Sequence, residues 1–335
     1  MTDMNVDSII NIVSPKKLKE IYSLDEENQR RIKIYRNTIK NILNGNDPRK
    51  LIVIGPCSIH NIEEASDYAV YIKKWINKFS DKLFIIMRVY FEKPRTNVGW
   101  KGLIYDPYIN DTNDISVGLI LARSLLLKLT EMEIPIGCEF LDTIIPQYIA
   151  DLISWGAIGA RTSECQLHRQ LASGLSMPIG FKNGTSGNID VAVNGILSAS
   201  YKHCFPGITD QGIACIVETK GNKECHIILR GGNTGVNYTI ENIEYTRAKM
   251  LEKHIIPNIM IDCSHANSEK NYRNQKYVIN YLLSHSNSII GVMIESNIIE
   301  GKQSIPPTEY GKSITDPCIG VEESVELLQL LYNSI

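Results

Sequence analysis

Eight short runs rich in β-forming residues recur along this chain, and stretches with helical patterning separate them. Each such pair predicts one strand followed by one helix, and eight pairs are typical of a closed parallel (β/α)8 barrel, the TIM-barrel class of α/β fold. The expected strands are Leu51–Pro56, Leu83–Tyr90, Ile136–Phe140, Ile158–Arg161, Ile179–Lys182, His226–Arg230, Ile259–Asp262 and Ile289–Ile294.

The intervening segments support this prediction. Glu63–Phe79 has apolar residues at helical spacing, and Pro146–Trp155 is expected to be a helix that Gly156 ends. An open doubly wound sheet would also alternate strands and helices, but the chain has no GxGxxG motif after its first expected strand. A single barrel with added segments accounts for the 335 residues.

Three segments do not belong to the alternation of strands and helices. Residues 1–48 form an expected N-terminal arm and helix with regulatory or oligomer contacts, ahead of a catalytic barrel over residues 49–335. A loop at Phe91–Asp114 is long enough to suggest a functional role. An insertion at about 203–224 contains the apolar run Ile213–Val217 between turn-forming residues, which predicts a β-hairpin.

The composition is that of an ordinary globular protein. Apolar residues make up 43% of the chain, charged residues 21%, and the net charge is −2, so we expect no nucleic-acid or membrane binding. The apolar stretches are too short to span a bilayer, the N-terminus lacks signal-peptide features, and a cytoplasmic location is expected. The eight cysteines show no CxxC spacing, which argues against a disulfide framework or a zinc ribbon.

In an α/β barrel, functional side chains stand at the carboxyl ends of the strands. Every expected strand here leads into a polar, reactive or charged residue. One charged residue beside an apolar run is usually a solvated end, but several cations at one mouth would repel each other unless an anion lay among them. Arg binds phosphate bidentately, so a phosphorylated substrate is predicted. The residues are Cys57, Arg88, Glu139, Arg161, Lys182, Arg230, His265 and Glu295.

Four of the mouth residues also suggest a metal site. Cys57, His265, Glu295 and Asp316 offer sulfur, nitrogen and carboxylate donors, which suit manganese, iron, zinc or copper better than calcium or magnesium. Taken singly, Cys57 is more often a buried thiol and His265 a hydrogen-bonded barrel histidine, and spacing alone leaves both interpretations open. The long loop contributes Lys93–Thr96, which is either an exposed segment or a second phosphate site.

Seven segments together resemble the type I 3-deoxy-D-arabino-heptulosonate 7-phosphate (DAHP) synthases, and the similarity runs from about Glu27 to the C-terminus. The motif set is highly specific to that family. The segments are Gly55–Ser58, Arg88–Thr96, Gly159–Thr162, Gly180–Thr185, His226–Gly232, Asp262–Asn267 and Ser313–Asp316.

The resemblance implies condensation of phosphoenolpyruvate with erythrose 4-phosphate, with release of phosphate, as the first step toward chorismate and the aromatic amino acids. It further implies a divalent transition metal held by Cys57, His265, Glu295 and Asp316. It assigns phosphoenolpyruvate to Arg88, Lys93, Arg161, Lys182 and Arg230, and erythrose 4-phosphate to Lys93, Pro94, Arg95 and Thr96. Lys93 is expected to assist proton transfer.

The resemblance also implies feedback inhibition by an aromatic amino acid and assembly as a homodimer or homotetramer. At Gly207, a glycine would leave room for a tyrosine hydroxyl, so tyrosine is the expected inhibitor. The implied inhibitor residues are Pro146, Gln147, Ser176, Phe205, Gly207 and Val217.

Two other functions fit parts of the pattern. Lys182 at a strand end could form a Schiff base, as in barrel aldolases, although the metal set would then be unexplained. A protein that keeps the barrel and the amino-acid pocket but only binds is the second alternative, and the presence of all four expected metal ligands argues against it.

Overall fold

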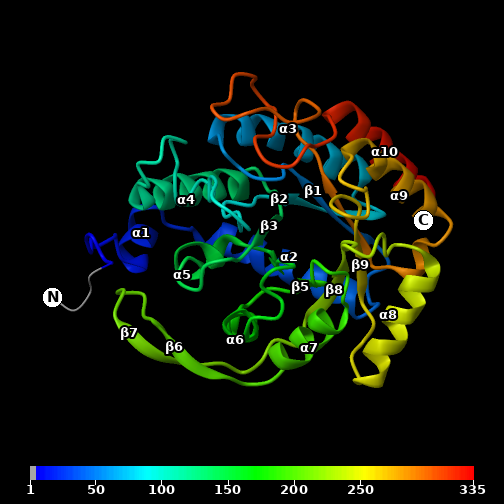
Figure 1. Ribbon diagram of the computed structural model, residues 1–335, viewed down its shortest axis with the longest axis horizontal. Helices are drawn as coiled ribbons and strands as arrows, with labels where there is room; N and C mark the ends of the chain where they lie inside the picture. The colour runs from blue at the N-terminus through cyan, green and yellow to red at the C-terminus, as the bar shows by residue number, and fades with distance from the viewer. Residues whose placement is uncertain (1–4) are drawn as a thin grey trace.

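The computed structural model describes residues 5–335 and contains a closed barrel of eight parallel strands in the order β1-β10-β9-β8-β5-β4-β3-β2 (Figure 1). This confirms the predicted (β/α)8 barrel. The strands are β1 Lys50–Gly55, β2 Leu83–Arg88, β3 Ile136–Glu139, β4 Trp155–Ile158, β5 Ile179–Lys182, β8 Cys225–Leu229, β9 Ile259–Asp262 and β10 Gly291–Glu295.

Helices surround the barrel, and several begin at side chains that cap their first turn. The Asn61 side chain accepts hydrogen bonds from the backbone N–H groups of Glu63 and Glu64, and Asp114 accepts one from Val117. The helices are α1 Pro15–Ile21, α2 Glu26–Leu43, α3 Ile62–Phe79, α4 Ile115–Glu131, α5 Pro146–Ile149, α6 Gln166–Gly174, α7 Asp190–Ala199, α8 Ile240–Glu252, α9 Gln275–Leu283 and α10 Val321–Asn333, with short 3-10 turns at Ala150–Leu152, Tyr272–Asn274 and Ser286–Ser288.

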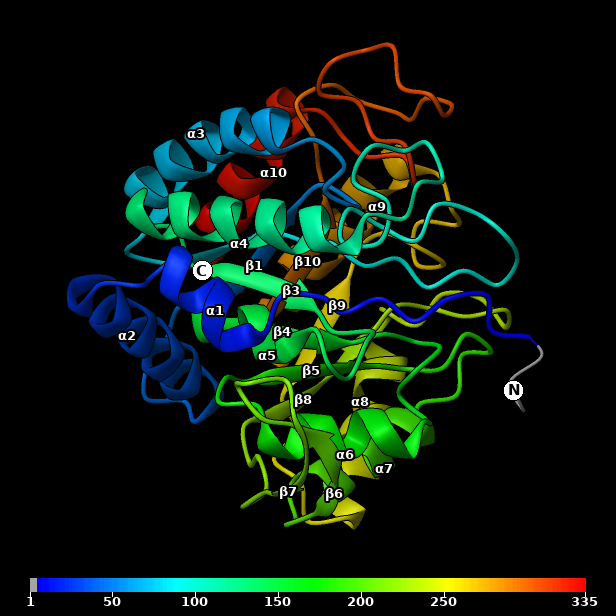
Figure 2. The same cartoon turned by 90° about the vertical axis from the view of Figure 1, so that its left-hand side faces the viewer.

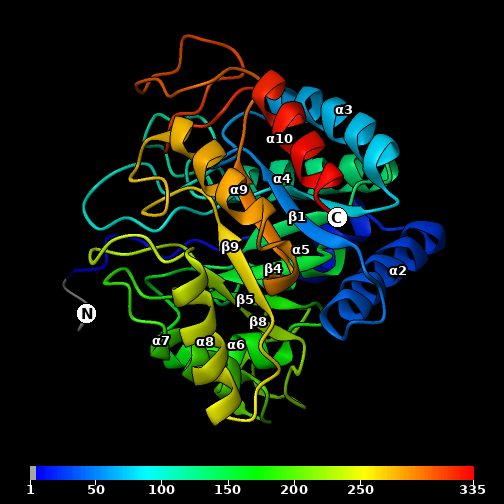
Figure 3. The ribbon, with the colours of Figure 1, turned by 90° about the vertical axis from the view of Figure 1, so that its right-hand side faces the viewer.

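The two ends of the barrel differ. Helix α2 lies across the end where the strands begin, and its buried residues Ile39 and Ile42 belong to the same apolar cluster as Val53 and Met293 of the strands. The long connections, including the loop between β2 and α4, gather at the opposite end (Figures 2 and 3). The mouth that carries the strand-end side chains is therefore left uncovered by α2.

The expected hairpin is present as a separate two-stranded antiparallel sheet, β6 Cys204–Ile208 and β7 Ala214–Glu218. It extends beside the barrel to α1 (Figure 1). There Asp210 accepts a hydrogen bond from the backbone of Lys16 at 2.7 Å and forms an ion pair with Lys19 at 2.9 Å. The N-terminal segment and the hairpin are thus joined at the hairpin turn.

The fourth strand begins earlier than predicted. Residues expected to end a helix, including Trp155, instead form β4, and α5 is a single turn followed by a 3-10 turn. Trp155 is fully buried among residues of the barrel interior, and its indole Nε1 donates a hydrogen bond to Nε2 of His226 at 3.3 Å. Gly156, predicted to stop a helix, lies within the strand, and Arg161 falls in the turn beyond it.

Within residues 5–335, no helix has the length and apolar character needed to cross a membrane.

The buried Trp155–His226 contact predicts a pH-dependent stability. Burial lowers the pKa of His226 to about 3, so between pH 6.5 and 3 the unfolded chain binds a proton that the folded chain does not, and stability falls with falling pH. The free energy of unfolding should drop on the order of 2 kcal/mol more between pH 7 and pH 5 in the wild type than in His226→Gln.

Denaturant titrations at several pH values would measure this difference. His254 is exposed, so His254→Gln should keep the wild-type pH dependence. Equal pH slopes for the wild type and His226→Gln would contradict the prediction.

Candidate active site

The mouth of the barrel is organised around a buried ion pair. Arg88, the last residue of β2, places its guanidinium Nη2 at 2.9 Å from Oε1 of Glu295, the last residue of β10, and the two side chains are 1% and 0% exposed. Arg88 also donates to the carbonyl groups of Pro56 and Cys57, both at 3.1 Å. The ion pair therefore connects β2 and β10 across the end of β1.

Gly55 allows these strand ends to approach. A Cβ atom at this position would lie 2.7 Å from the carbonyl oxygen of Arg88, closer than carbon and oxygen can pack. Steric exclusion thus explains why the Gly55–Ser58 motif begins with glycine. The residues that follow place Cys57 at the mouth.

Three of the four expected metal ligands lie together. The ligand atoms of Cys57, Glu295 and Asp316 all fall within 4.8 Å of one another, a possible metal site of one sulfur and two carboxylates. Burial raises the pKa of the Cys57 thiol to about 12, with Glu295 adding to the effect and Lys93 opposing it. A divalent cation among these donors would favour the thiolate.

His265 stands beside this cluster but outside it. Its Nε2 is 3.8 Å from Oε1 of Glu295, and its Nδ1 is 2.9 Å from Oδ2 of Asp262. Burial opposes a charge on Asp262, but His265 and Lys182 outweigh it and hold its pKa well below the usual range. Asp262 therefore holds the imidazole with Nε2 directed toward the cluster. Sequence reasoning did not assign Asp262 this role.

The predicted cations of the mouth differ in their surroundings. Lys182 is buried, with its Nζ 3.2 Å from Asp262 and 3.8 Å from Glu139. Arg230 is partly buried, and within residues 5–335 its side chain makes no hydrogen bond or ion pair. Arg161 is exposed, which follows from its place in a turn, and it donates a hydrogen bond to Oγ1 of Thr96 at 3.3 Å.

The segment Lys93–Thr96 lies between the metal cluster and Arg161. Lys93 directs its Nζ to the Cys57 sulfur at 3.1 Å, and Arg95 donates to the carbonyl of Trp100 at 2.8 Å. Pro94 is partly buried between them. Lys93 therefore faces the metal cluster, whereas Thr96 faces Arg161.

A buried carboxylate holds this loop in place and was not anticipated from the sequence. Glu92 is 1% exposed and accepts hydrogen bonds from the backbone N–H groups of Leu141 and Asp142 and from the Tyr105 hydroxyl. Burial raises its pKa to about 8. Leu141 and Asp142 lie 49 and 50 positions away along the chain, so no local motif indicated that Glu92 would bind them.

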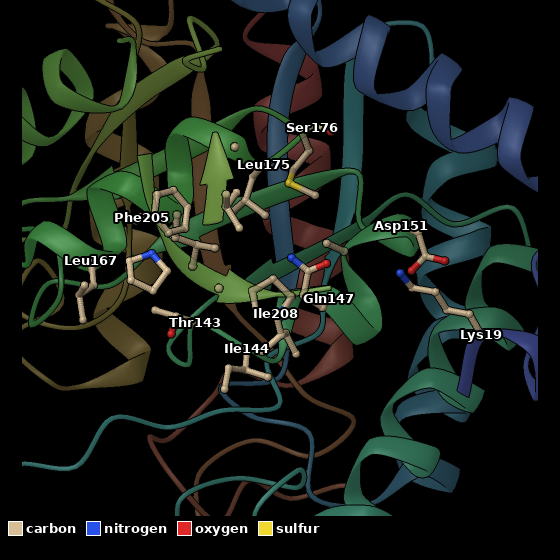
Figure 4. Close-up of a pocket in the computed structure, with 18 of the residues that line it drawn as sticks. Lys19, Thr143, Ile144, Gln147, Asp151, Leu167, Leu175, Ser176, Phe205 and Ile208 are labelled. Atoms are coloured by element: carbon tan, nitrogen blue, oxygen red, sulfur yellow. The ribbon is translucent and has the colours of Figure 1, made fainter. Parts of the chain in front are cut away.

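A second site lies away from the mouth. A cavity of about 600 Å³ opens between α5, α6 and the β6–β7 hairpin, and Lys19 reaches it from α1 (Figure 4). All six residues predicted for an inhibitor line it. A Cβ atom at Gly207 would lie 2.7 Å from Cγ2 of Val217, so the glycine also keeps the two hairpin strands close. The six are Pro146, Gln147, Ser176, Phe205, Gly207 and Val217.

Comparison with known proteins identifies the family. Residues 22–329 match the model of the DAHP synthetase I family. The chain belongs to this family. The motif-based resemblance is thereby confirmed, and this DAHP synthase is an enzyme that forms a carbon–carbon bond.

Relatives agree over nearly the whole chain. The Phe-sensitive phospho-2-dehydro-3-deoxyheptonate aldolase of Escherichia coli K12 is 46% identical, over 99% of this chain and 97% of its own length. The Tyr-sensitive enzyme of the same strain is also 46% identical, over 97% and 93%. A solved structure of phospho-2-dehydro-3-deoxyheptonate aldolase from Francisella tularensis SCHU S4 superimposes with a TM-score of 0.97 at 46% identity, covering 99% of this chain and 98% of that one.

The relatives' names bear on regulation. Two enzymes of equal identity to this chain carry different inhibitors in their names, and both are named as feedback-sensitive to an aromatic amino acid. Feedback sensitivity is therefore a property of such DAHP synthases, whereas overall identity does not select phenylalanine or tyrosine.

The buried pair of Arg88 and Glu295 gives a stability prediction. In metal-free protein, Glu295→Ala should lower the free energy of unfolding by about 3–5 kcal/mol, because the Arg88 guanidinium stays buried without its counter-ion. Glu300→Ala, which removes the exposed partner of Arg273, should change stability little. Denaturant unfolding of both variants in the presence of a chelator measures this, and equal effects would contradict it.

Proposed function

We propose that this DAHP synthase condenses phosphoenolpyruvate with D-erythrose 4-phosphate and releases inorganic phosphate. The observation that carries the proposal is the convergence of Arg88, Lys93 and Lys182 beside the donor cluster of Cys57 and Glu295. Several cations and a metal site at one mouth suit substrates that bear phosphate and carboxylate groups.

Phosphoenolpyruvate is assigned to Arg88, Lys93, Arg161, Lys182 and Arg230. Two of these, Arg88 and Lys182, already face carboxylates, whereas the Arg230 side chain has no bonded partner in the described part of the chain. Arg230 is therefore available to hold an anion with its full hydrogen-bonding capacity. Its five N–H donors suit a phosphate or carboxylate group bound bidentately.

Erythrose 4-phosphate is assigned to Lys93, Pro94, Arg95 and Thr96. The hydrogen bond between Arg161 and Thr96 supports a position next to phosphoenolpyruvate, because it brings the two proposed binding groups into contact. Proline restricts the backbone between Lys93 and Arg95, which favours a fixed direction for their side chains. Bringing two reactants together in this way supplies much of the advantage over reaction in free solution.

The donor set supports one divalent transition metal, manganese, iron, zinc or copper, with Cys57, Glu295 and Asp316 as ligands and His265 as the fourth. When bound, such a metal supplies Lewis-acid activation of the sugar aldehyde. In the condensation, the enol carbon of phosphoenolpyruvate attacks the aldehyde carbon, and water adds to the resulting cation with loss of a proton. The hemiketal phosphate that results loses inorganic phosphate by C–O cleavage, which leaves the ketone of the product.

Lys93 is the proposed proton donor to the aldehyde oxygen. Burial opposes a charge on Lys93, but the neighbouring Cys57, Asp316 and Glu295 outweigh it and raise its pKa. The ammonium group therefore holds a proton beside the cluster, where negative charge would develop as the carbon–carbon bond forms.

The Schiff-base alternative is less well supported. The Lys182 amine lies within ion-pair distance of two carboxylates, Asp262 at 3.2 Å and Glu139 at 3.8 Å, so its Nζ is already engaged. A Schiff base at Lys182 would give up these interactions and would leave the donor cluster of Cys57 and Glu295 without a role. Covalent trapping of Lys182 by borohydride in the presence of substrate would support this alternative.

The condensation is tested by phosphate release from phosphoenolpyruvate and erythrose 4-phosphate together. Activity should be lost with a chelator and restored by added metal ions. Cys57→Ala should lower the rate at least a hundredfold even with excess metal, because it removes the sulfur ligand. Cys204→Ala, at an exposed site on the hairpin, should keep the wild-type rate. Metal-loaded protein that binds an aromatic amino acid but releases no phosphate would instead favour the non-catalytic sensor.

We further propose that the cavity near the hairpin binds an aromatic amino acid, with tyrosine as the inhibitor. Its volume of about 600 Å³ is within the range of small-molecule sites. Figure 4 shows apolar side chains such as Phe205 and Leu175 together with the polar groups of Gln147, Lys19 and Asp151 around the same space. Apolar walls with a few charged groups suit an aromatic side chain attached to an amino-acid backbone.

Tyrosine should inhibit the purified enzyme at lower concentration than phenylalanine or tryptophan. Gly207→Ser should weaken tyrosine inhibition about tenfold or more, because the added side chain occupies space beside Val217. Cys204→Ser lies on the same strand but outside the cavity, so it should leave inhibition unchanged. Phosphate-release assays over a range of each amino acid decide this, and stronger inhibition by phenylalanine in the wild type would contradict the tyrosine assignment.

The expected homodimer or homotetramer stays a prediction, as does the division into an arm of residues 1–48 and a catalytic barrel. Apolar side chains exposed on the N-terminal segment, Ile9 and Ile10, and on the hairpin, Ile213 and Ile216, support self-association. Light scattering of the purified protein measures the assembly.

A further inference from the structure

Three asparagines are buried beneath the mouth of the barrel, beside the proposed phosphoenolpyruvate groups. Asn183 directly follows Lys182 at the end of β5, Asn237 lies in the loop between β8 and α8, and Asn267 follows β9. Their exposed fractions are 0%, 8% and 2%. Buried amides must find hydrogen-bond partners, so the partners of these three side chains indicate what they hold.

The Asn183 amide uses its full hydrogen-bonding capacity at the end of β8. Its Oδ1 accepts from the backbone N–H of Arg230 at 2.8 Å and from Nδ2 of Asn237 at 3.1 Å. Its Nδ2 donates to the carbonyl groups of Gly184 and Gly231, both at 2.9 Å. With two donors and two acceptor positions filled, this side chain has one orientation.

Asn237 and Asn267 continue the chain of amides to β9. Asn237 accepts the backbone N–H of Gly231 at 2.7 Å, and its own backbone N–H donates to Oδ1 of Asn267 at 2.9 Å. Asn267 in turn donates to the carbonyl groups of Leu229 at 3.1 Å and Asp262 at 2.9 Å. One connected network therefore spans the mouth ends of β5, β8 and β9.

The network fixes the backbone where Arg230 leaves the barrel. Gly231 has a positive φ of 69°, and a Cβ atom there would lie 2.8 Å from the backbone of Ala266, so the chain turns sharply and closely after Arg230. Two amides hold the N–H groups on either side of this turn. Because the Arg230 side chain has no bonded partner of its own within residues 5–335, its direction depends on the backbone that these amides hold.

We propose that the amide network of Asn183, Asn237 and Asn267 positions Lys182 and Arg230 for binding phosphoenolpyruvate, with Asn237 as the positioning residue that connects the other two. The inference rests on the proposed function, since it takes these two cations as ligands of that substrate. Asn237 itself touches neither cation's charged group, and its contribution is to preorganise them.

Asn237→Asp is the sharpest test, because the two side chains have the same shape. One carboxylate oxygen keeps the Gly231 N–H, but the other replaces the Nδ2 donor and faces the Asn183 oxygen, so a hydrogen bond becomes a repulsion. In the metal-loaded full-length protein, the KM for phosphoenolpyruvate and its calorimetric Kd should rise at least tenfold, while the KM for erythrose 4-phosphate stays within twofold.

The pH dependence provides a second readout. A carboxyl group buried at this position has a raised pKa, and in its protonated form it can again donate to Asn183. The ratio of the variant's KM for phosphoenolpyruvate to that of the wild type should therefore fall toward one as the pH is lowered from 8 toward 6. Taking the ratio removes the ionisation of the substrate itself. A defect that is purely structural would not be relieved in this way.

Asn242→Asp is the matched control. Among the described residues, its side-chain amide forms a hydrogen bond only with the Thr239 hydroxyl, at 2.9 Å, so the same chemical change should leave both KM values at wild type. Asn237→Ala removes the amide without adding a charge, and it should raise the KM for phosphoenolpyruvate with no relief at low pH. Should Asn237→Asp fail to fold, the alanine variant decides the proposal by the same split between the two KM values.

An unchanged Kd for phosphoenolpyruvate in folded Asn237→Asp and Asn237→Ala would overturn the inference, as would an equal rise in both KM values. Failure of the proposed function would look different from failure of this inference. The wild-type protein itself would then neither bind phosphoenolpyruvate in calorimetry nor release phosphate.

Discussion

The buried pair of Arg88 and Glu295 is the interaction on which the mouth of this barrel depends. It joins β2 to β10 across the end of β1, and Arg88 also donates hydrogen bonds to two carbonyl groups of the turn that carries Cys57 and to the Met293 sulfur. The same carboxylate accepts the Ser264 hydroxyl and lies within the donor cluster. Glu295 is thus both the counter-ion of a guanidinium and a member of the candidate metal site. A cation bound in this cluster and an anion bound beside Arg88 would therefore compensate each other's charge through this carboxylate.

Much of this arrangement could be predicted from sequence because barrels place function at strand ends. This rule uses only the position of a residue in the sequence and needs no knowledge of tertiary contacts. Taking the residue at or just after each β-rich run identified Cys57, Arg88, Lys182 and Glu295 as residues of the mouth. For Arg161 the rule was less accurate, because this residue lies in a turn three positions after the end of β4. The apolar run that includes Trp155 was assigned to a helix, since Gly156 resembles a helix stop, so the strand was placed too late.

The error at β4 has a physical origin that no local pattern contains. Trp155 belongs to the barrel because its indole fills the interior against His226, a partner 71 positions away in the chain. The same is true of the residues that hold the site in place. Glu92 acts on Leu141 and Asp142, and Asn237 acts on Asn183, through single hydrogen bonds between distant segments. Such contacts depend on the finished fold, so a sequence without aligned relatives shows the groups that bear charge but not those that orient them.

The segment after β3 connects the barrel mouth to the cavity beside the hairpin. Glu92, next to Lys93, holds the backbone N–H groups of Leu141 and Asp142, and the Asp142 carboxylate in turn accepts the N–H groups of Ile144 and Ile145 just before α5. Helix α5 supplies Pro146 and Gln147 to the wall of the cavity beside the hairpin. A ligand that displaced α5 would therefore act on the loop that carries Lys93 through a short run of hydrogen bonds. Because coupling between two binding sites is reciprocal, a substrate that ordered this loop would alter the affinity of the hairpin cavity by the same factor.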